Sequence, residues 1–196
     1  MTADAATSPP NETRHAKAEA PVKSRITPTN TEVPLRDDDW IVSKTDPTGR
    51  IIYLNRTFMR IANYRESELL GRQHNAIRHP DMPRGVFRLL WETLKQEREF
   101  FGLVKNMTSD GHYYWVFANI TADINAAGQT VGYVSVRRQA PVAAVHAVMP
   151  LYAEMLRIER ESGAATAPEA SVAYLWQLLA AQQTTYDRFV LGLYQQ

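Results

Sequence analysis

The hydrophobic period of this sequence changes from strand to helix and back to strand. Residues 41–43 and 51–54 are short strand-like runs, joined at 46–50 by a turn with Pro and Gly. Three further runs with strand character follow a helical middle, at residues 101–107, 113–122 and 130–137. Hairpins on both sides of a helical middle predict an α+β domain, in which a five-stranded antiparallel sheet carries helices on one face.

The helical middle contains three predicted helices. Asn55 has the chemistry of an N-cap residue and precedes an amphipathic stretch at 56–63. A short helix is predicted at 64–71, where a glycine acts as the stop. The longest helix is predicted at 85–98, because apolar residues recur there at i, i+3, i+4 and i+7.

Residues 78–83, with the sequence Arg-His-Pro-Asp-Met-Pro, lie directly before the longest helix. Phe87 and Trp91 follow one turn apart on that helix, beside its apolar stripe. Polar groups at this density next to aromatic side chains suit the rim of a small-molecule pocket, which combines apolar walls with a few placed polar groups. A proline-rich surface loop ahead of a helix start at Pro83 is the alternative that the residue types leave open.

Composition divides the chain into a folded unit and its flanking segments. Residues 1–33 are rich in Ala, Thr, Pro, Ser and Asn without a hydrophobic period, so we expect a flexible tail. The folded domain is predicted over 34–140. Two C-terminal amphipathic helices are predicted at 141–161 and 169–196, separated by a linker at 162–168.

Several function classes conflict with the composition. The 196 residues include no cysteine, which excludes disulfides, thiolate metal sites and a light-driven flavin–cysteine adduct. A net charge of +1 gives no indication of a nucleic-acid partner. The apolar patches at 140–151 and 172–181 are shorter than the ~20 residues of a membrane helix, and no signal peptide is evident. We therefore expect no membrane span and a cytoplasmic location.

A group of short motifs gives the sequence a family resemblance. The motifs are residues 71–75, 78–83, 104–106, 114–116, 118–119, 132–133 and 149–152, with Phe87 and Trp91. With them, the stretch from about residue 37 to residue 163 resembles the PAS domain of bacterial aerotaxis receptors, a family of flavin sensors. The string at 78–83 is the most specific of these matches, and about two-thirds of the chain is covered.

This resemblance implies a PAS fold that binds FAD non-covalently between its helices and its sheet and signals redox or oxygen state through protein contacts. By position, it implies that Arg78, His79 and Asp81 belong to the flavin-binding segment and that Trp91 lies on the helix covering the flavin. Asn106 aligns with the asparagine that hydrogen-bonds the flavin pyrimidine edge in related domains. The remaining candidates are Asn55, Phe87, Tyr114, Val116 and Arg137.

The chemistry of these residues agrees with that implication. The side-chain amide of Asn106 can match both a donor and an acceptor on a flavin edge, and aromatic side chains can wall the ring. The guanidinium of Arg78 suits the pyrophosphate of FAD. A reduced flavin anion would alter the charge beside His79 and Asp81, which predicts a route from redox state to helix position.

Two other functions stay open from the sequence. PAS pockets also hold haem, for which His74, His79, His112 or His146 would supply the axial ligand. A PAS module without a cofactor would fill its pocket with side chains and bind a partner through its C-terminal helices. Neither an enzyme nor a metal site is expected, because the sequence lacks a nucleophile–base pair, metal-ligand spacing and a dinucleotide fingerprint.

The two C-terminal helices raise the question of partners. Aerotaxis receptors continue into a membrane anchor and a kinase-controlling coiled coil, neither of which is expected in this sequence. The helices would then pack on the sheet, dimerise or dock on a signalling protein, and of these we expect packing. We also expect a homodimer, since both PAS domains and exposed amphipathic helices favour one.

Overall fold

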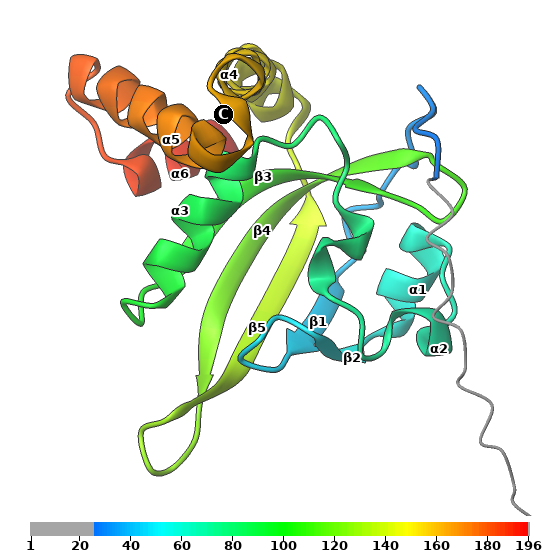
Figure 1. Cartoon of the computed structure of the whole chain (residues 1–196). Coiled ribbons are helices and arrows are strands. Elements are labelled where there is room, and N and C mark those ends of the chain that lie inside the picture. The colour runs from blue at the N-terminus through cyan, green and yellow to red at the C-terminus, as the bar shows by residue number, and fades with distance from the viewer. Residues whose placement is uncertain (1–25, 196) are drawn as a thin grey trace, which may run out of the picture.

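The computed structural model describes residues 26–195, and its centre is one five-stranded antiparallel sheet (Figure 1). The strands are β1 (Ile41–Thr45), β2 (Ile51–Leu54), β3 (Phe100–Met107), β4 (Tyr113–Ile124) and β5 (Thr130–Gln139). Their order is β2-β1-β5-β4-β3, so pairing between β1 and β5 joins the first hairpin to the later strands. The predicted sheet and the α+β class are confirmed.

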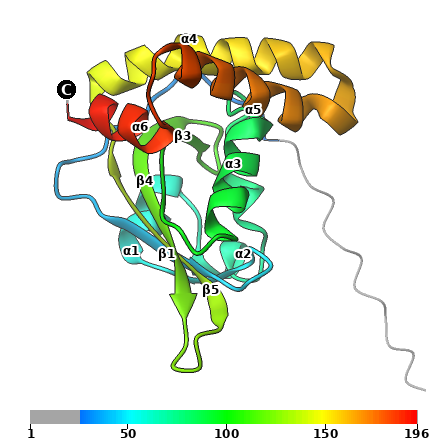
Figure 2. The same ribbon diagram turned by 90° about the vertical axis from the view of Figure 1, so that its left-hand side faces the viewer.

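The two faces of the sheet have different neighbours. Asn106 of β3 pairs with Tyr114 of β4, and Ala118 of β4 pairs with Arg137 of β5. Because side chains alternate along a strand, these four residues point to one face. The helices that cover this face (Figure 1, Figure 2) are α1 (Arg56–Ala62), α2 (Glu66–Leu69), the 3-10 turn η1 (His74–Ile77) and α3 (Arg84–Leu94).

Local hydrogen bonds set the ends of α1. The side-chain oxygen of Asn55 accepts from the Phe58 amide at 3.0 Å, which begins the helix. Asn63 ends it in the left-handed conformation, with φ of 54°. The turn η1 is not predicted by periodicity, because a four-residue turn is too short to show an apolar period.

Three helices follow the sheet where periodicity predicts two: α4 (Val142–Glu161), α5 (Gly163–Ala181) and α6 (Tyr186–Tyr194). The predicted linker at 162–168 is wrong, because Pro168 lies inside α5. Proline removes the amide that would bond the Ala164 carbonyl, and Arg84 of α3 donates to that oxygen instead, at 3.0 Å. The predicted helix at 169–196 is also divided, since Thr185 caps a separate helix α6.

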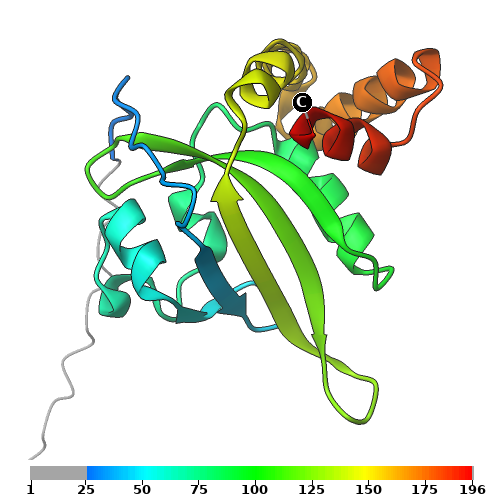
Figure 3. The same cartoon turned by 180° about the vertical axis from the view of Figure 1, so that it is seen from behind.

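The C-terminal helices pack on the domain, as expected. Tyr152 of α4 stacks with Trp115 on the face opposite to α3, and its hydroxyl donates to the Leu103 carbonyl oxygen at 2.8 Å. Tyr194 of α6 lies against Phe117 on the same face, with ring centroids 4.2 Å apart. Figure 3 shows α4 and α6 gathered at one end of this face.

The described part of the predicted N-terminal tail is paired with the sheet. The Val33 amide donates to the Tyr113 carbonyl at 2.7 Å, and the Tyr113 amide donates to Thr31 at 3.0 Å. Residues 1–25 of the predicted tail lie outside the described residues. The flexible-tail prediction is wrong for residues 26–33, because backbone hydrogen bonds hold them. Such bonds do not depend on side chains, so no hydrophobic period in the sequence indicates them.

A carboxylate fastens the C-terminal helices to the start of α3. Glu159 of α4 is 9% exposed and accepts from the amides of Arg84 at 3.0 Å and Gly85 at 2.8 Å. The Ser171 hydroxyl of α5 also donates to Glu159, at 2.7 Å. An anion at a helix N-terminus satisfies amides that have no partner inside the helix. Gly85 permits this approach, because a Cβ there would lie 2.2 Å from the Ser171 hydroxyl oxygen.

Glu159→Ala is expected to lower the free energy of unfolding by about 1–3 kcal/mol, because it leaves two helix amides without their acceptor and removes one of the two acceptors of the Ser171 hydroxyl. Urea unfolding followed by far-UV circular dichroism measures the change. Glu161→Ala is the matched control, since this carboxylate is 62% exposed and pairs with Arg157, so its loss should cost less than about 1 kcal/mol. Equal effects of the two substitutions would contradict the capping role.

Candidate functional site

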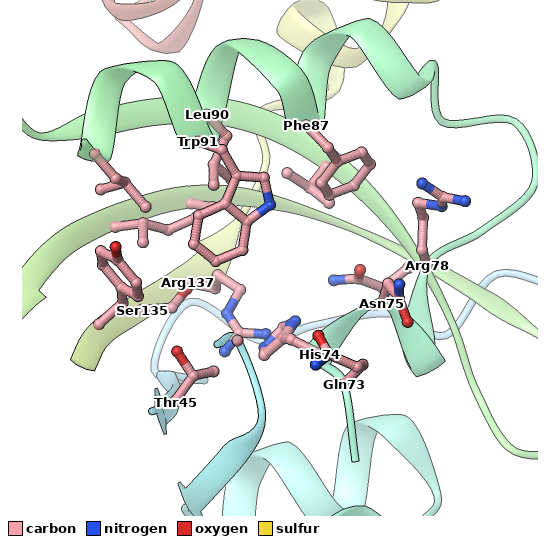
Figure 4. A pocket seen from close by; sticks show the side chains of 17 residues that line it. Thr45, Gln73, His74, Asn75, Arg78, Phe87, Leu90, Trp91, Ser135 and Arg137 are labelled. Atoms are coloured by element: carbon pink, nitrogen blue, oxygen red, sulfur yellow. The ribbon is translucent and has the colours of Figure 1, made fainter. Parts of the chain in front are cut away.

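A cavity of about 180 Å³ lies between α3 and the sheet (Figure 4). A single buried water needs only ~10–15 Å³, so the cavity can hold a larger group. Its apolar lining comes from Phe87, Leu90, Trp91, Leu94, Val104, Ala118 and Ile120. Its polar lining comes from Thr45, Gln73, His74, Asn75, Arg78, Asn106, Tyr133, Ser135 and Arg137. We call these polar residues the floor of the cavity. Apolar walls with a polar floor are typical of a ligand site.

The floor holds polar groups that lack partners within residues 26–195. Asn106 is 3% exposed, and its Nδ2 makes no hydrogen bond there. The same holds for Nε and Nη1 of Arg137 and for the Thr45 hydroxyl. Buried polar groups in folded proteins are almost always bonded. The arrangement therefore suits a ligand that presents hydrogen-bond acceptors to Asn106 and Arg137.

Arg137 is a buried cation without a carboxylate partner. Its guanidinium donates to the Ser43 hydroxyl and lies 4.9 Å from the centroid of the Phe58 ring. Burial lowers the pKa of Arg137 to about 10, so the group stays charged near neutral pH. No Asp or Glu lines the cavity, and no ion pair in the described part of the chain includes Arg137. The floor is consequently positive.

His74 lies beside Arg137 and is neutral (Figure 4). Burial and the Arg137 cation lower the pKa of His74 to about 3. Its Nε2 lies 3.1 Å from the Ser43 hydroxyl oxygen, which already accepts from Arg137. The Ser43 proton is therefore free for Nε2, which leaves the ring proton of His74 on Nδ1. Ser43 thus links the cation on β5 to the imidazole on η1.

Arg78 lines a different part of the cavity, separated from Thr45 by the width of the site (Figure 4). It is partly exposed, and its guanidinium lies 5.3 Å from the centroid of the Phe87 ring. Burial and the nearby Arg84 cation lower the pKa of Arg78. Trp91 meets Tyr133 edge to face, with centroids 5.3 Å apart. The aromatic side chains of α3 thus wall the cavity between its two cations.

Residues 78–83 run along the outer edge of β3. The His79 amide donates to the Lys105 carbonyl at 3.3 Å, and the Lys105 amide donates to Met82 Sδ at 3.2 Å. Lys105 Nζ donates to the Asp81 carboxylate at 2.6 Å, while His79 Nδ1 accepts from the Asp81 amide at 3.1 Å. His79 and Asp81 therefore hold the loop on the strand and do not line the cavity. The sequence predicts that a charge on the reduced flavin acts on His79 and Asp81, but neither side chain contacts the cavity directly.

Three other predicted residues also lie outside the lining. Tyr114 and Val116 share the cavity face of β4 but are fully buried away from it. Asn55 uses its amide on the backbone, since it caps α1 and donates to the Trp40 carbonyl at 2.7 Å. The predicted residues that the structure brings together are Arg78, Phe87, Trp91, Asn106 and Arg137. Their contact with a ligand stays a prediction.

Several polar residues of the floor were not among the predicted site residues. Ser135 and Tyr133 lie two and four positions before Arg137 on β5, so strand alternation places them on the same face. Thr45 pairs with Tyr133 across β1 and β5. A period of two counted back from Arg137 would have identified both β5 residues. Gln73 lies before the short turn η1 and has no strand alternation to identify it, so its signal was its place in the 71–75 motif.

The free energy of unfolding is expected to fall as the pH drops below ~6.5, by up to ~1.4 kcal/mol per pH unit from His74 alone. His74 is neutral in the fold, with a pKa of about 3, whereas the unfolded chain binds a proton at its ordinary pKa. Its contribution is thus complete above the unfolded pKa and is lost toward pH 3. Urea unfolding at several pH values should show a shallower slope for His74→Gln. The exposed His146→Gln is the control, and equal slopes would contradict the assignment.

Comparison with known proteins identifies the domain. Residues 51–137 match a family model described as the PAS fold. The aerotaxis receptor of Escherichia coli (strain K12) is 41% identical over 124 residues, which are 63% of this chain and 24% of that protein. The nitrogen fixation regulatory protein of Klebsiella oxytoca is 30% identical over 102 residues, which are 52% of this chain and 21% of that protein. The chain thus matches about a quarter or less of the length of these relatives.

Solved structures show the same fold. A structure from work on a flavin analogue and the light-oxygen-voltage domain mechanism has a TM-score of 0.50 and 21% identity, covering 57% of this chain and 83% of that chain. Across residues 26–195, no helix has the length and apolar character needed to cross a membrane. The family match spans most of the cavity-lining positions, from Gln73 to Arg137. Residues 51–137 therefore have the PAS fold, and 124 residues of this chain are similar to the aerotaxis receptor.

Proposed function

We propose that this chain is a sensor that binds a flavin non-covalently in the cavity beneath α3 and passes its redox state to a protein partner. The observation that carries the proposal is the set of unpartnered polar atoms on Asn106 and Arg137, opposite the aromatic wall of α3. A flat aromatic ring with acceptors along one edge matches such a site. The relationship to the aerotaxis receptor supports a redox or oxygen signal.

Each wall of the cavity has a role in this proposal. The Asn106 amide would fix the orientation of the ring edge, since it offers one donor group and one acceptor. Trp91 and Phe87 would cover the ring and exclude water from it. A bound flavin supplies reversible electron uptake, and the residues of this chain bind it, orient it and set the charge around it.

Arg78 favours FAD as the flavin. It is partly exposed, lies beside Phe87 and belongs to none of the ion pairs within residues 26–195. A guanidinium can bind two phosphate oxygens at once, which suits the pyrophosphate that only FAD carries. FMN would bring a single phosphate to the same cation, so both flavins belong in the test.

A haem sensor is the second candidate. Among the histidines considered as axial ligands, only His74 lines the cavity, and its Nε2 faces the Ser43 hydroxyl. His79 is bonded to the Asp81 amide through Nδ1, and its unpartnered Nε2 belongs to a residue outside the cavity lining. His112 is bonded to Thr29, and His146 is exposed on α4. The one histidine of the cavity is neutral and engaged by a hydroxyl, and the same cavity is lined by an unpartnered amide, which favours a flavin over haem.

The proposed output is contact with another protein rather than catalysis. Helix α3 supports this role, because it lines the cavity and is bonded through Arg84 and Gly85 to Glu159 of α4. A change in the cavity that displaces α3 can therefore act directly on the C-terminal helices through these hydrogen bonds. A homodimer is part of the proposal, with these helices as the surface that changes.

Asn106→Leu is expected to weaken FAD binding by about 10–100-fold, equal to about 1.4–2.8 kcal/mol, because it removes the edge-binding amide while keeping the side-chain size. Titration of the apoprotein with FAD and FMN, followed by flavin fluorescence, measures the affinity. Asn119→Leu is the matched control, since Asn119 lies on the opposite face of the sheet and bonds Glu99.

Equal flavin affinities for the wild type and Asn106→Leu would contradict the role of Asn106 in flavin binding. Failure of the wild type to bind either flavin would refute the proposed function. Uptake of haemin in a parallel titration would then establish the haem sensor. A protein that binds none of the three would be a PAS interaction module without a cofactor.

A further inference from the structure

The charge on the cavity floor is unbalanced. Arg78 and Arg137 are the charged side chains among the lining residues, and only Arg137 is buried, at 2% exposure. Two of its guanidinium nitrogens, Nε and Nη1, make no hydrogen bond within the described residues, and the third donates to Ser43. A group with five N–H donors thus uses few of them inside the protein.

Every element around the guanidinium presents a neutral group. Ser43 of β1 accepts from it, and the Phe58 ring of α1 lies beneath it. His74 of η1 is neutral, and burial raises the pKa of Tyr114 on β4, so this phenol is neutral as well. The cavity residues Ser135 of β5 and Asn106 of β3 carry no charge. Removing an ion from water costs several kcal/mol unless an opposite charge lies nearby. Within residues 26–195 no carboxylate pairs with Arg137, so a molecule in the cavity would have to supply the opposite charge that offsets this cost.

We infer that Arg137 is the counterion for negative charge on the bound ligand, and that it makes a flavin in this cavity easier to reduce. The inference rests on the proposed function for the identity of the ligand. Each electron that a reductant such as dithionite donates adds one negative charge to the flavin. Beside a fixed cation this charge is stabilised without uptake of a proton, so the reduced form is favoured over the oxidised form.

Three variants separate the charge of Arg137 from its shape. Arg137→Met removes the charge and keeps an unbranched side chain, while Arg137→Lys keeps the charge and removes the planar fork. Arg138→Met is the matched control, because Arg138 is the next residue but points to the opposite face, where its guanidinium lies 4.4 Å from the Tyr194 ring centroid.

Spectroelectrochemical titration of the flavin-loaded full chain measures the reduction potential. Arg137→Met is expected to weaken binding of reduced flavin relative to oxidised flavin by tenfold or more, a fall of about 59 mV or more for a one-electron step. Arg137→Lys and Arg138→Met should stay close to the wild type. The potential of Arg137→Met should also vary more steeply with pH, because reduction then requires a proton. An unchanged potential and pH slope in Arg137→Met would overturn the inference.

The melting temperature of the apoprotein tests, without a flavin, whether Arg137 is a counterion for ligand charge. If Arg137 serves ligand charge, Arg137→Met raises the melting temperature of the apoprotein, because it removes an unpaired buried cation. If Arg137 only links Ser43 and Phe58, the substitution lowers the melting temperature of the apoprotein, and the inference is wrong. A wild type that binds no flavin refutes the proposed function, and the apoprotein comparison still decides the role of Arg137.

Discussion

The rest of the structure depends on the hydrogen bonds that cover the outer edge of β3. An edge strand leaves a row of backbone groups without partners, and proteins must cover it. Here the 78–83 loop bonds the backbone of Lys105, and Tyr152 of α4 donates to the carbonyl of Leu103. Because the two attachments are neighbours on one strand, the loop that brings Arg78 to the cavity and the first C-terminal helix are anchored together. Their positions are not independent.

Helix α3 joins the cavity to the C-terminal helices by a second set of contacts. Phe87 and Trp91 face the cavity, while the first amides of the helix bond Glu159 of α4. Arg84 completes the link by donating to Ala164, the carbonyl that a proline leaves free in α5. A displacement of α3 would change the contacts on both sides of it. This shared helix is the physical basis of the proposed path from ligand to protein surface.

The changes of hydrophobic period, together with turn residues between the runs, were sufficient to predict the five strands and the helices α1 and α3. Periodicity failed where non-periodic contacts decide the structure. Pro168 lies inside a helix, where Arg84 donates to the carbonyl that the proline leaves without an amide partner. Residues 26–33 are held by backbone hydrogen bonds and by the bond between the Thr29 and His112 side chains. The motif at 78–83 located the site, but its role is mostly structural. The charge of the floor depends on which residues meet across strands, and local spacing does not show that.

The visible absorbance spectrum of the purified full chain, recorded before and after dithionite, tests the flavin assignment most directly. We predict the absorbance bands of an oxidised flavin and their loss on reduction, since the unpartnered amide and cation on the floor suit a ligand with matching acceptors. A sharp Soret band, or a colourless protein that also takes up no added FAD, would contradict this account of the cavity.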